Sequence, residues 1–155
     1  MSENRRDFIK ASGAAGLLAA AGLLGAGATF AQQPARNKAA FETKSVNDTV
    51  KALGGGGVAE SKDIAITAPD IAENGAVVPV SVASKIPNTQ AVYIMVEKNP
   101  NTLAAGFNIP QGTEASVTTR IKMGQTSNVY AVVKADNKFF MSSKEIKVTI
   151  GGCGG

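Results

Sequence analysis

The sequence predicts an all-β protein in which short antiparallel strands pack as a sandwich. Two patterns carry this prediction. Apolar and polar residues alternate with period two over much of residues 63–150, and turn residues recur about every 10 to 15 positions. About six or seven such strands are typical of an immunoglobulin-like antiparallel β-sandwich, although the Cys–Trp–Cys pattern of antibody domains is absent.

Residues 1–31 have the features of an export signal, and we exclude them from the predicted fold. Arg5 and Arg6 precede a run rich in alanine and glycine, as in the twin-arginine signals of bacteria. The run is a weak candidate for a membrane anchor, because a span needs about 20 strongly apolar residues. We expect export to the periplasm, with cleavage after Ala28 or Ala31.

Residues 32–57 are predicted to form a linker, one helix over 38–53 and a glycine hinge. Val46, Val50 and Leu53 have the spacing of one helix face. Four glycines follow, and the first of them suits a left-handed helix cap. No Gly-Lys-Ser/Thr sequence follows these glycines, so a phosphate-binding loop is not predicted.

The sandwich is predicted to span residues 58–150. Val78, Val80 and Val82 share one face of a strand, and Pro79 indicates that this strand lies at an edge or carries a bulge. The expected strands are 63–68, 76–84, 90–98, 115–123, 128–136, 138–142 and 145–150.

The larger apolar side chains are interpreted as core or as a partner interface. Met95 and Met123 are predicted to be core residues, since methionine fills irregular gaps in a core. The aromatic residues with the same interpretation are Tyr93, Phe107, Tyr130, Phe139 and Phe140.

The composition excludes several classes of function. Histidine, the usual general base and a common metal ligand, is absent from the chain. The formal net charge of +4 is spread along the chain, so no basic cluster predicts nucleic-acid binding. Asp63, Asp70 and Glu73 are interpreted as solvated surface. We therefore predict no catalytic residue, no cofactor and no metal.

Residues 151–155, with the sequence GGCGG, are predicted to form a flexible arm after the last strand. Glycine contributes no side chain to a core and loses the most freedom on ordering, so a structural role explains this segment poorly. Extended, the arm places Cys153 roughly 10 Å beyond Ile150. The predicted arm glycines are Gly151, Gly152, Gly154 and Gly155, and Cys153 is the predicted point of covalent attachment.

The segment KVTIGGCGG, after a small β domain with a twin-arginine signal, resembles the SoxY family. SoxY proteins are the substrate-carrier subunits of the bacterial Sox system, which oxidises thiosulfate and related compounds. The resemblance covers the layout of the whole chain and is most specific at residues 151–155. It implies a carrier rather than an enzyme, and a heterodimer with a SoxZ-like sandwich subunit that lacks its own signal.

The resemblance also implies a cycle on Cys153. A SoxAX-like c-type cytochrome attaches thiosulfate oxidatively to this residue, and a SoxB-like dimanganese hydrolase releases sulfate from the adduct. In systems that have one, a SoxCD-like dehydrogenase oxidises the remaining sulfane sulfur.

The surroundings of Cys153 predict a slow thiol in the free protein. An unperturbed thiol has a pKa near 8.5, so only about 3 per cent is thiolate at pH 7. The terminal carboxylate of Gly155 disfavours a second anion, and Lys147 is the nearest cation in the sequence. We therefore expect activation by the active site of a partner.

Two other functions fit parts of the sequence. An exported structural or adhesion module could use Cys153 in an intermolecular disulfide. A ubiquitin-like sulfur carrier could form a thiocarboxylate at Gly155, but that chemistry needs ATP and a cytoplasmic enzyme, and the export signal argues against both.

Overall fold

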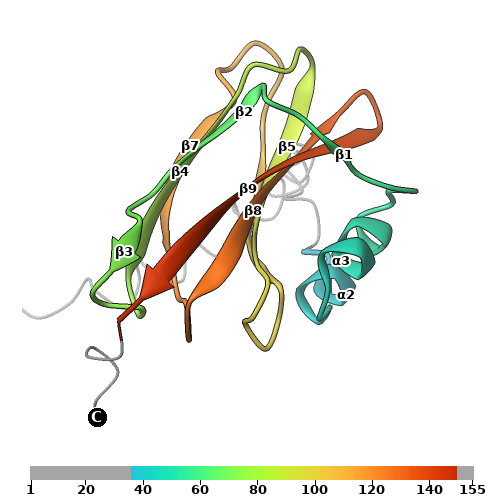
Figure 1. Ribbon diagram of the computed structural model, residues 1–155. Coiled ribbons are helices and arrows are strands. Elements are labelled where there is room, and N and C mark those ends of the chain that lie inside the picture. The colour runs from blue at the N-terminus through green and yellow to red at the C-terminus, as the bar shows by residue number, and fades with distance from the viewer. Residues whose placement is uncertain (1–35, 150–155) are drawn as a thin grey trace, which may run out of the picture. The chain divides into compact units, whose positions relative to one another are not determined.

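The computed structural model describes residues 36–149, which fold as two facing β-sheets with two short helices (Figure 1). The larger sheet has the order β1-β9-β8-β5-β6, and β3 also pairs with β9; the smaller has the order β2-β4-β7. The elements are α2 (Lys38–Phe41), α3 (Val46–Ala52), β1 (Ala59–Glu60), β2 (Ile64–Thr67), β3 (Ile71–Ala72), β4 (Val78–Ser84), β5 (Thr89–Val96), β6 (Leu103–Asn108), β7 (Ser116–Ile121), β8 (Ser127–Ala135) and β9 (Lys138–Val148).

The longer strands pair antiparallel in both sheets, as the sequence predicts. Only the two-residue strands β1 and β3, among the strands described, run parallel to their partner β9. The all-β, immunoglobulin-like sandwich with helical structure at its N-terminal end is thus confirmed. The predicted arm and the predicted signal lie outside the described residues.

Aliphatic side chains from alternate strand positions fill the space between the sheets. β8 shows the alternation: Val129, Ala131 and Val133 point into this core, while Val132 points to the opposite face. Burial of each such side chain contributes about 1.5–3 kcal/mol. The core consists of Ile64, Ala72, Val78, Val80, Val82, Val92, Ile94, Val96, Ile121, Met123, Val129, Ala131, Val133 and Ile146.

The two helices cover part of the other face of the larger sheet. Ala40 and Val50 pack there against Met95, Leu103, Val132 and Phe139. Because β5 and β8 are therefore covered on both faces, each contains a continuous apolar run, at 91–96 in β5 and at 129–133 in β8.

The aromatic and methionine residues are core residues, as predicted, but they divide between two clusters. Phe139 is buried under the helices, where Tyr93 and Tyr130 also pack. Phe107 and Phe140 pack against the core between the sheets. Met95 and Met123 are both buried, as predicted, with Met95 in the helix-side cluster and Met123 in the inter-sheet core.

The prediction of one continuous helix over 38–53 is wrong. The helix stops after Phe41, and the carbonyl of Thr43 accepts a hydrogen bond from Thr102 N at 2.9 Å. Ser45 then caps a new helix, since its hydroxyl accepts from Asp48 N at 3.1 Å. The break lets the chain contact the sheet at Thr102.

The end of α3 has the predicted left-handed cap, in a Schellman arrangement. Gly54 has φ +88°, its N–H donates to Lys51 O at 2.9 Å, and Gly55 N donates to Val50 O at 2.8 Å. Gly55 also packs on Phe139, where a Cβ atom would come within 2.7 Å of the ring. The hinge in this glycine run stays a prediction.

Two strand features differ from the sequence prediction. β6 was not expected, because its sequence LAAGFN shows no clear alternation. The expected strands 138–142 and 145–150 form one long strand, β9, which pairs with β8 along its length. Pro79 lies beyond the last pair of β2 with β4, which is Thr67–Ser81, so β4 is locally an edge there.

Candidate functional site

The residues predicted to form the site lie outside the part of the chain that the structure describes. These residues are Cys153, the arm glycines Gly151, Gly152, Gly154 and Gly155, and the signal residues Arg5 and Arg6. The structure instead describes the chain up to Thr149, two residues before the predicted arm. We call this region the arm root and define it as residues 147–149 with the bordering segment 70–77.

One edge of β9 is held at the arm root by β3. The N–H of Lys147 donates to Asp70 O at 2.9 Å, and the N–H of Thr149 donates to Ala72 O at 3.1 Å. The parallel register places Ile71 beside Lys147 and Ala72 beside Val148. Since successive N–H groups of a strand point to opposite edges, the intervening N–H of Val148 faces the other side.

The other edge of β9 is held by the turn that leads into β8. The N–H of Val148 donates to Thr126 Oγ1 at 3.0 Å, directly after the last β8–β9 pair, Ser127–Ile146. The chain is therefore hydrogen-bonded on both edges up to Thr149, the last described residue.

A tight contact between Gly75 and Met123 fixes the position of segment 70–77. Met123 N donates to Gly75 O at 2.7 Å. A Cβ atom on Gly75 would lie 2.4 Å from Met123 O and 2.9 Å from a methyl carbon of Val148. Glycine is thus required here by close packing, and the segment lies against both the core and the last strand.

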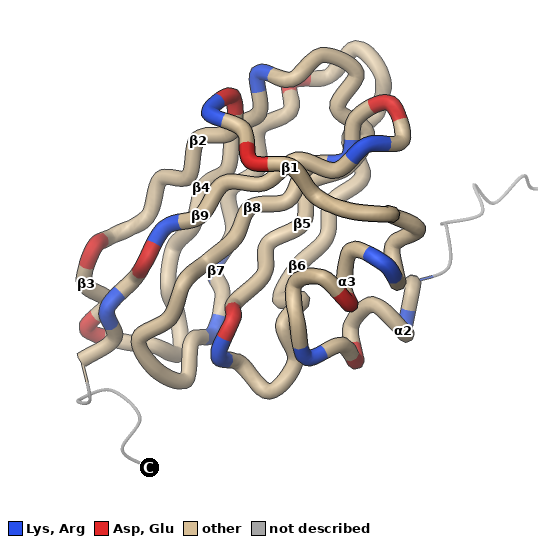
Figure 2. Tube along the Cα trace, turned by 45° about the vertical axis from the view of Figure 1, so that its right-hand side comes forward, with Lys and Arg blue, Asp and Glu red and all other residues tan. Residues whose placement is uncertain are grey.

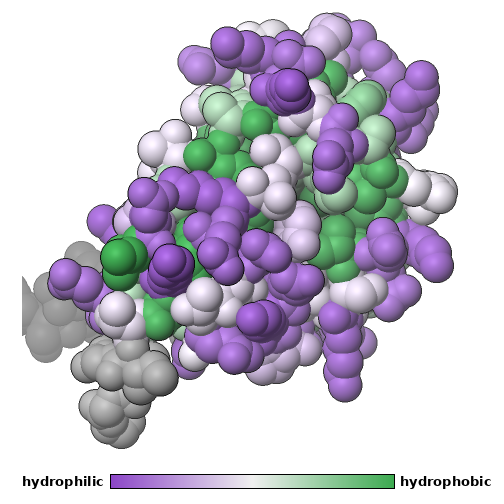
Figure 3. All heavy atoms as spheres, viewed as in Figure 1, coloured by the Kyte–Doolittle hydropathy of each residue, from purple (hydrophilic) through white to green (hydrophobic). Residues whose placement is uncertain are grey.

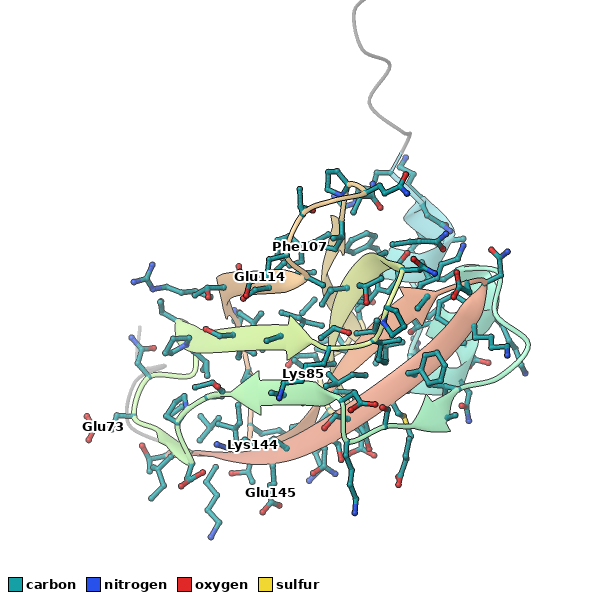
Figure 4. The ribbon with its side chains drawn as sticks, turned by 90° about the horizontal axis from the view of Figure 1, so that it is seen from above. Glu73, Lys85, Phe107, Glu114, Lys144 and Glu145 are labelled. Carbon is teal, nitrogen blue, oxygen red and sulfur yellow. The ribbon has the colours of Figure 1, made fainter. Side chains whose placement is uncertain are left out.

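Charged residues of both signs surround the arm root. Lys144 Nζ lies 3.0 Å from Asp70 Oδ1 and also donates to Ala68 O. Glu145 and Glu73 point away from the sandwich (Figure 4), and acidic and basic residues lie side by side along the end of β9 (Figure 2). The local field therefore has no dominant sign.

The titratable residues of the described region do not gather into a metal-ligand cluster. Between residues 36 and 149, no group of three acidic, histidine or cysteine residues could hold a metal ion. Burial raises the pKa of the Tyr93 hydroxyl above its ordinary value, but Tyr93 packs in the helix-side cluster and not at the arm root. No helix in the same range is long and apolar enough to cross a membrane.

A hollow of about 560 Å³ lies at the end of the sandwich opposite the arm root. Its walls come from the loops around residues 84–90 and 109–115, with Asp136 from the β8–β9 turn. They include Lys85 and Glu114, both labelled in Figure 4. The hollow therefore has no part in positioning the arm.

The sequence prediction missed the residues that hold the arm root. β3 is only two residues long, too short for alternation to reveal. Thr126 lies between two expected strands, and its bond to Val148 joins positions 22 residues apart. The one available signal was Asn74-Gly75 in a turn-rich segment.

Comparison with known proteins identifies a matching family and a similar solved structure. The family model of the sulfur oxidation protein SoxY matches residues 50–153, more than half of the 155 residues. The structure of the sulfur carrier protein SoxY from Chlorobium limicola f thiosulfatophilum is 38% identical, with a TM-score of 0.59. That match covers 66% of this chain and 96% of the other.

A weaker structural match adds nothing to the assignment. It is to the bacterial superantigen toxic shock syndrome toxin-1, at 11% identity and a TM-score of 0.40, over 56% of this chain and 99% of the other. No curated protein matches the chain.

Proposed function

Because the chain belongs to the SoxY family, we propose that it carries sulfur intermediates covalently on Cys153 and presents them to the enzymes of the Sox system. The family is one of sulfur-oxidation carrier proteins. One observation supports the attachment site most strongly: the only cysteine of the chain follows, within four residues, a strand end that is hydrogen-bonded on both edges. A fixed strand with a short glycine segment beyond it suits the delivery of one atom to several active sites.

Loading of the carrier is an oxidation. The Cys153 sulfur bonds to the outer sulfur of thiosulfate, the thiol proton leaves to solvent, and two electrons pass one at a time through the haem of a SoxAX-like cytochrome to its electron acceptor. The product is a cysteine S-thiosulfonate. Formation of the S–S bond releases two electrons, so this step requires an electron acceptor, and the SoxAX-like cytochrome supplies it.

Unloading of sulfate is a hydrolysis. Water adds to the terminal sulfonate sulfur in a SoxB-like hydrolase, the S–S bond to that sulfur breaks, and sulfate departs. The electron pair of the broken bond stays on the remaining sulfur, which is left on Cys153 as a persulfide. A SoxCD-like dehydrogenase, where one is present, then oxidises this sulfane sulfur.

The chain itself supplies attachment and not catalysis in this proposal. A carrier needs one nucleophilic sulfur and no competing thiol, and Cys153 is the only cysteine in the sequence. The proposal also includes a SoxZ-like partner subunit and a periplasmic location, with export directed by Arg5 and Arg6. The twin-arginine route suits this pair because it moves folded proteins.

Intact-protein mass spectrometry tests the carrier function. The chain is purified without reductant from cells growing on thiosulfate, and the adducts are mapped by fragmentation. We expect additions of sulfur, sulfonate or thiosulfonate on Cys153 that a reductant removes. The Cys153→Ser variant from the same cells is the control and should carry none.

Two outcomes would contradict the proposal. An unmodified thiol throughout growth on thiosulfate would exclude a carrier role. A stable disulfide-linked dimer as the only modified form would favour an exported structural module in its place.

A further inference from the structure

Asn74 and Gly75 form a potentially reactive pair in the turn between β3 and β4. Asn74 is the only asparagine of the chain that a glycine follows. The backbone nitrogen after an asparagine can attack the side-chain amide, and glycine, which has no Cβ atom, obstructs this attack least. Asn74 is exposed, and the preceding Glu73 points away from the sandwich (Figure 4). Figure 3 shows hydrophilic residues on the surface of the part of the molecule that carries β3.

The turn leaves the two reacting groups available. Within residues 36–149, neither the N–H of Gly75 nor the side-chain Nδ2 of Asn74 has a hydrogen-bond partner. Oδ1 of Asn74 accepts a hydrogen bond from Ala76 N at 2.9 Å. Because Oδ1 gains negative charge when the side-chain amide is attacked, this backbone donor stabilises the tetrahedral intermediate.

The other asparagines between positions 36 and 149 lack this combination. Asn99 precedes a proline, which has no N–H, and its Nδ2 donates to Lys122 O at 2.7 Å. The Nδ2 of Asn128 donates to Glu97 Oε2 at 3.0 Å. Asn101 is exposed but precedes a threonine, whose branched side chain obstructs the attack.

We propose that Asn74 is a modification site, at which the folded protein deamidates to isoaspartate, and that this product releases segment 70–77 from the end of β9. The nitrogen of Gly75 bonds to Cγ of Asn74, and the bond from Cγ to Nδ2 breaks. Nδ2 leaves as ammonia with the proton from the Gly75 nitrogen. Water then opens the cyclic imide at either carbonyl, which gives aspartate or isoaspartate without an oxidant. The inference is independent of the proposed carrier function, since Cys153 takes no part in it.

The isoaspartyl product does not fit the packed turn. Its main chain runs through the former side chain, so one more carbon atom separates residues 74 and 75. Gly75 has no space for a displacement toward the core, because even a Cβ atom on it would lie 2.4 Å from Met123 O. The former Asn74 O, which accepts from Val77 N at 3.3 Å, becomes part of a carboxylate outside the main chain. The turn must therefore rearrange.

The same short segment carries the acceptors that hold β9. Asp70 O accepts from Lys147 N at 2.9 Å, and Ala72 O accepts from Thr149 N at 3.1 Å. Ala72 lies only two residues before Asn74 in the sequence. A turn that moves away from the core therefore displaces these carbonyl groups and weakens both bonds.

Ageing of the full chain tests the site. The folded protein is kept at mildly alkaline pH, and conversion at each asparagine is followed by fragmentation mass spectrometry, with isoaspartate identified by a methyltransferase specific for it. We expect conversion about ten-fold faster at Asn74 than at Asn101, because glycine leaves the attack unobstructed. The Asn74→Ser variant keeps a hydroxyl acceptor for Ala76 N and should show no conversion at this position.

Hydrogen exchange tests the structural consequence. The isoaspartyl fraction is separated by chromatography and compared with Asn74→Asp, a matched control that adds the charge without the extra main-chain carbon. We expect the amides of Lys147 and Thr149 to exchange about five-fold faster or more in the isoaspartyl fraction, because local opening exposes them. The amide of Val148 should change less, since it donates to Thr126 Oγ1 on the other edge of β9.

Each outcome decides one part of the proposal. Conversion at Asn74 that is no faster than at Asn101 would overturn the modification site. Conversion at Asn74 with unchanged exchange at Lys147 and Thr149 would overturn the release of segment 70–77. Equally fast exchange in Asn74→Asp would assign the release to the added charge and contradict the role of the longer main chain.

Discussion

The two ends of the sandwich close the same strands in different ways. At the arm root, backbone groups of segment 70–77 bond to β9 and to Met123, which lie 48 to 77 positions away in the sequence. At the opposite end, the loops around 84–90 and 109–115 combine short-range bonds, such as Thr113 Oγ1 to Pro110 O at 2.7 Å, with long-range backbone bonds, such as Ser84 N to Ala115 O at 2.9 Å. A hollow lies between those loops, whereas Gly75 packs tightly against Met123.

The difference shows where this fold is most constrained. The loops at the end with the hollow are held by local and long-range bonds, but they leave open space between them. At the other end, long-range backbone bonds hold β9 to the last described residue, and Gly75 packs closely against Met123. The backbone is therefore most closely packed at the end where β9 stops.

The largest expected contrast comes from one glycine at each end. Gly75→Ala places a Cβ atom 2.4 Å from the carbonyl oxygen of Met123, so the backbone must shift. We expect a loss of about 3 kcal/mol in the free energy of unfolding. Gly112→Ala has open space for its Cβ but a φ of +83°, so we expect a loss of about 1 kcal/mol. Urea unfolding of both variants measures the difference.

Equal losses in the two variants would contradict this contrast. They would mean that segment 70–77 can move away from Met123 at little cost.

The sequence predicts those parts of the fold that depend on local pattern. The alternation of Val78, Val80 and Val82 identifies both β4 and its buried face. The pair Asp136-Asn137 identifies the β8–β9 turn, where both residues have positive φ, as a two-residue hairpin loop requires. The family resemblance is read from the GGCGG segment itself.

Long-range contacts account for what the sequence does not predict. β3 and the bond from Thr126 to Val148 exist only because distant segments meet at the end of β9. The helix break at Thr43 depends on its bond to Thr102, 59 positions later. Periodicity cannot encode such pairings, so the sequence does not predict the contacts that hold residues 147–149.

A smaller contrast separates two threonine hydroxyls. Thr126→Val removes the acceptor for Val148 N in a partly buried position, so we expect a loss of about 1 kcal/mol in the free energy of unfolding. Hydrogen exchange of the Val148 amide should become faster. Thr113→Val at the opposite end removes the exposed hydroxyl that donates to Pro110 O. Water can donate to this carbonyl instead, so we expect a loss of less than about 0.5 kcal/mol. Unchanged exchange at Val148 in Thr126→Val would show that this bond does not hold the strand end.

The smallest contrast compares two carboxylates, and it tests whether charge or backbone bonding holds the arm root. Asp70→Asn removes the ion pair with Lys144, and the Asp70 side chain is 89% exposed, so we expect a change of less than about 0.5 kcal/mol. Asp136→Asn at the other end should also be nearly neutral, since asparagine tolerates the φ of +46° at this position.

Thermal unfolding at low and high salt provides the measurement for both variants. The Asp70→Asn variant keeps the backbone carbonyl that accepts from Lys147 N, so β9 should remain held and its stability should depend little on salt. A loss above about 1 kcal/mol that disappears in high salt would contradict this expectation. The position of the arm would then depend on ionic strength, and loading of the carrier should vary with salt in the same way.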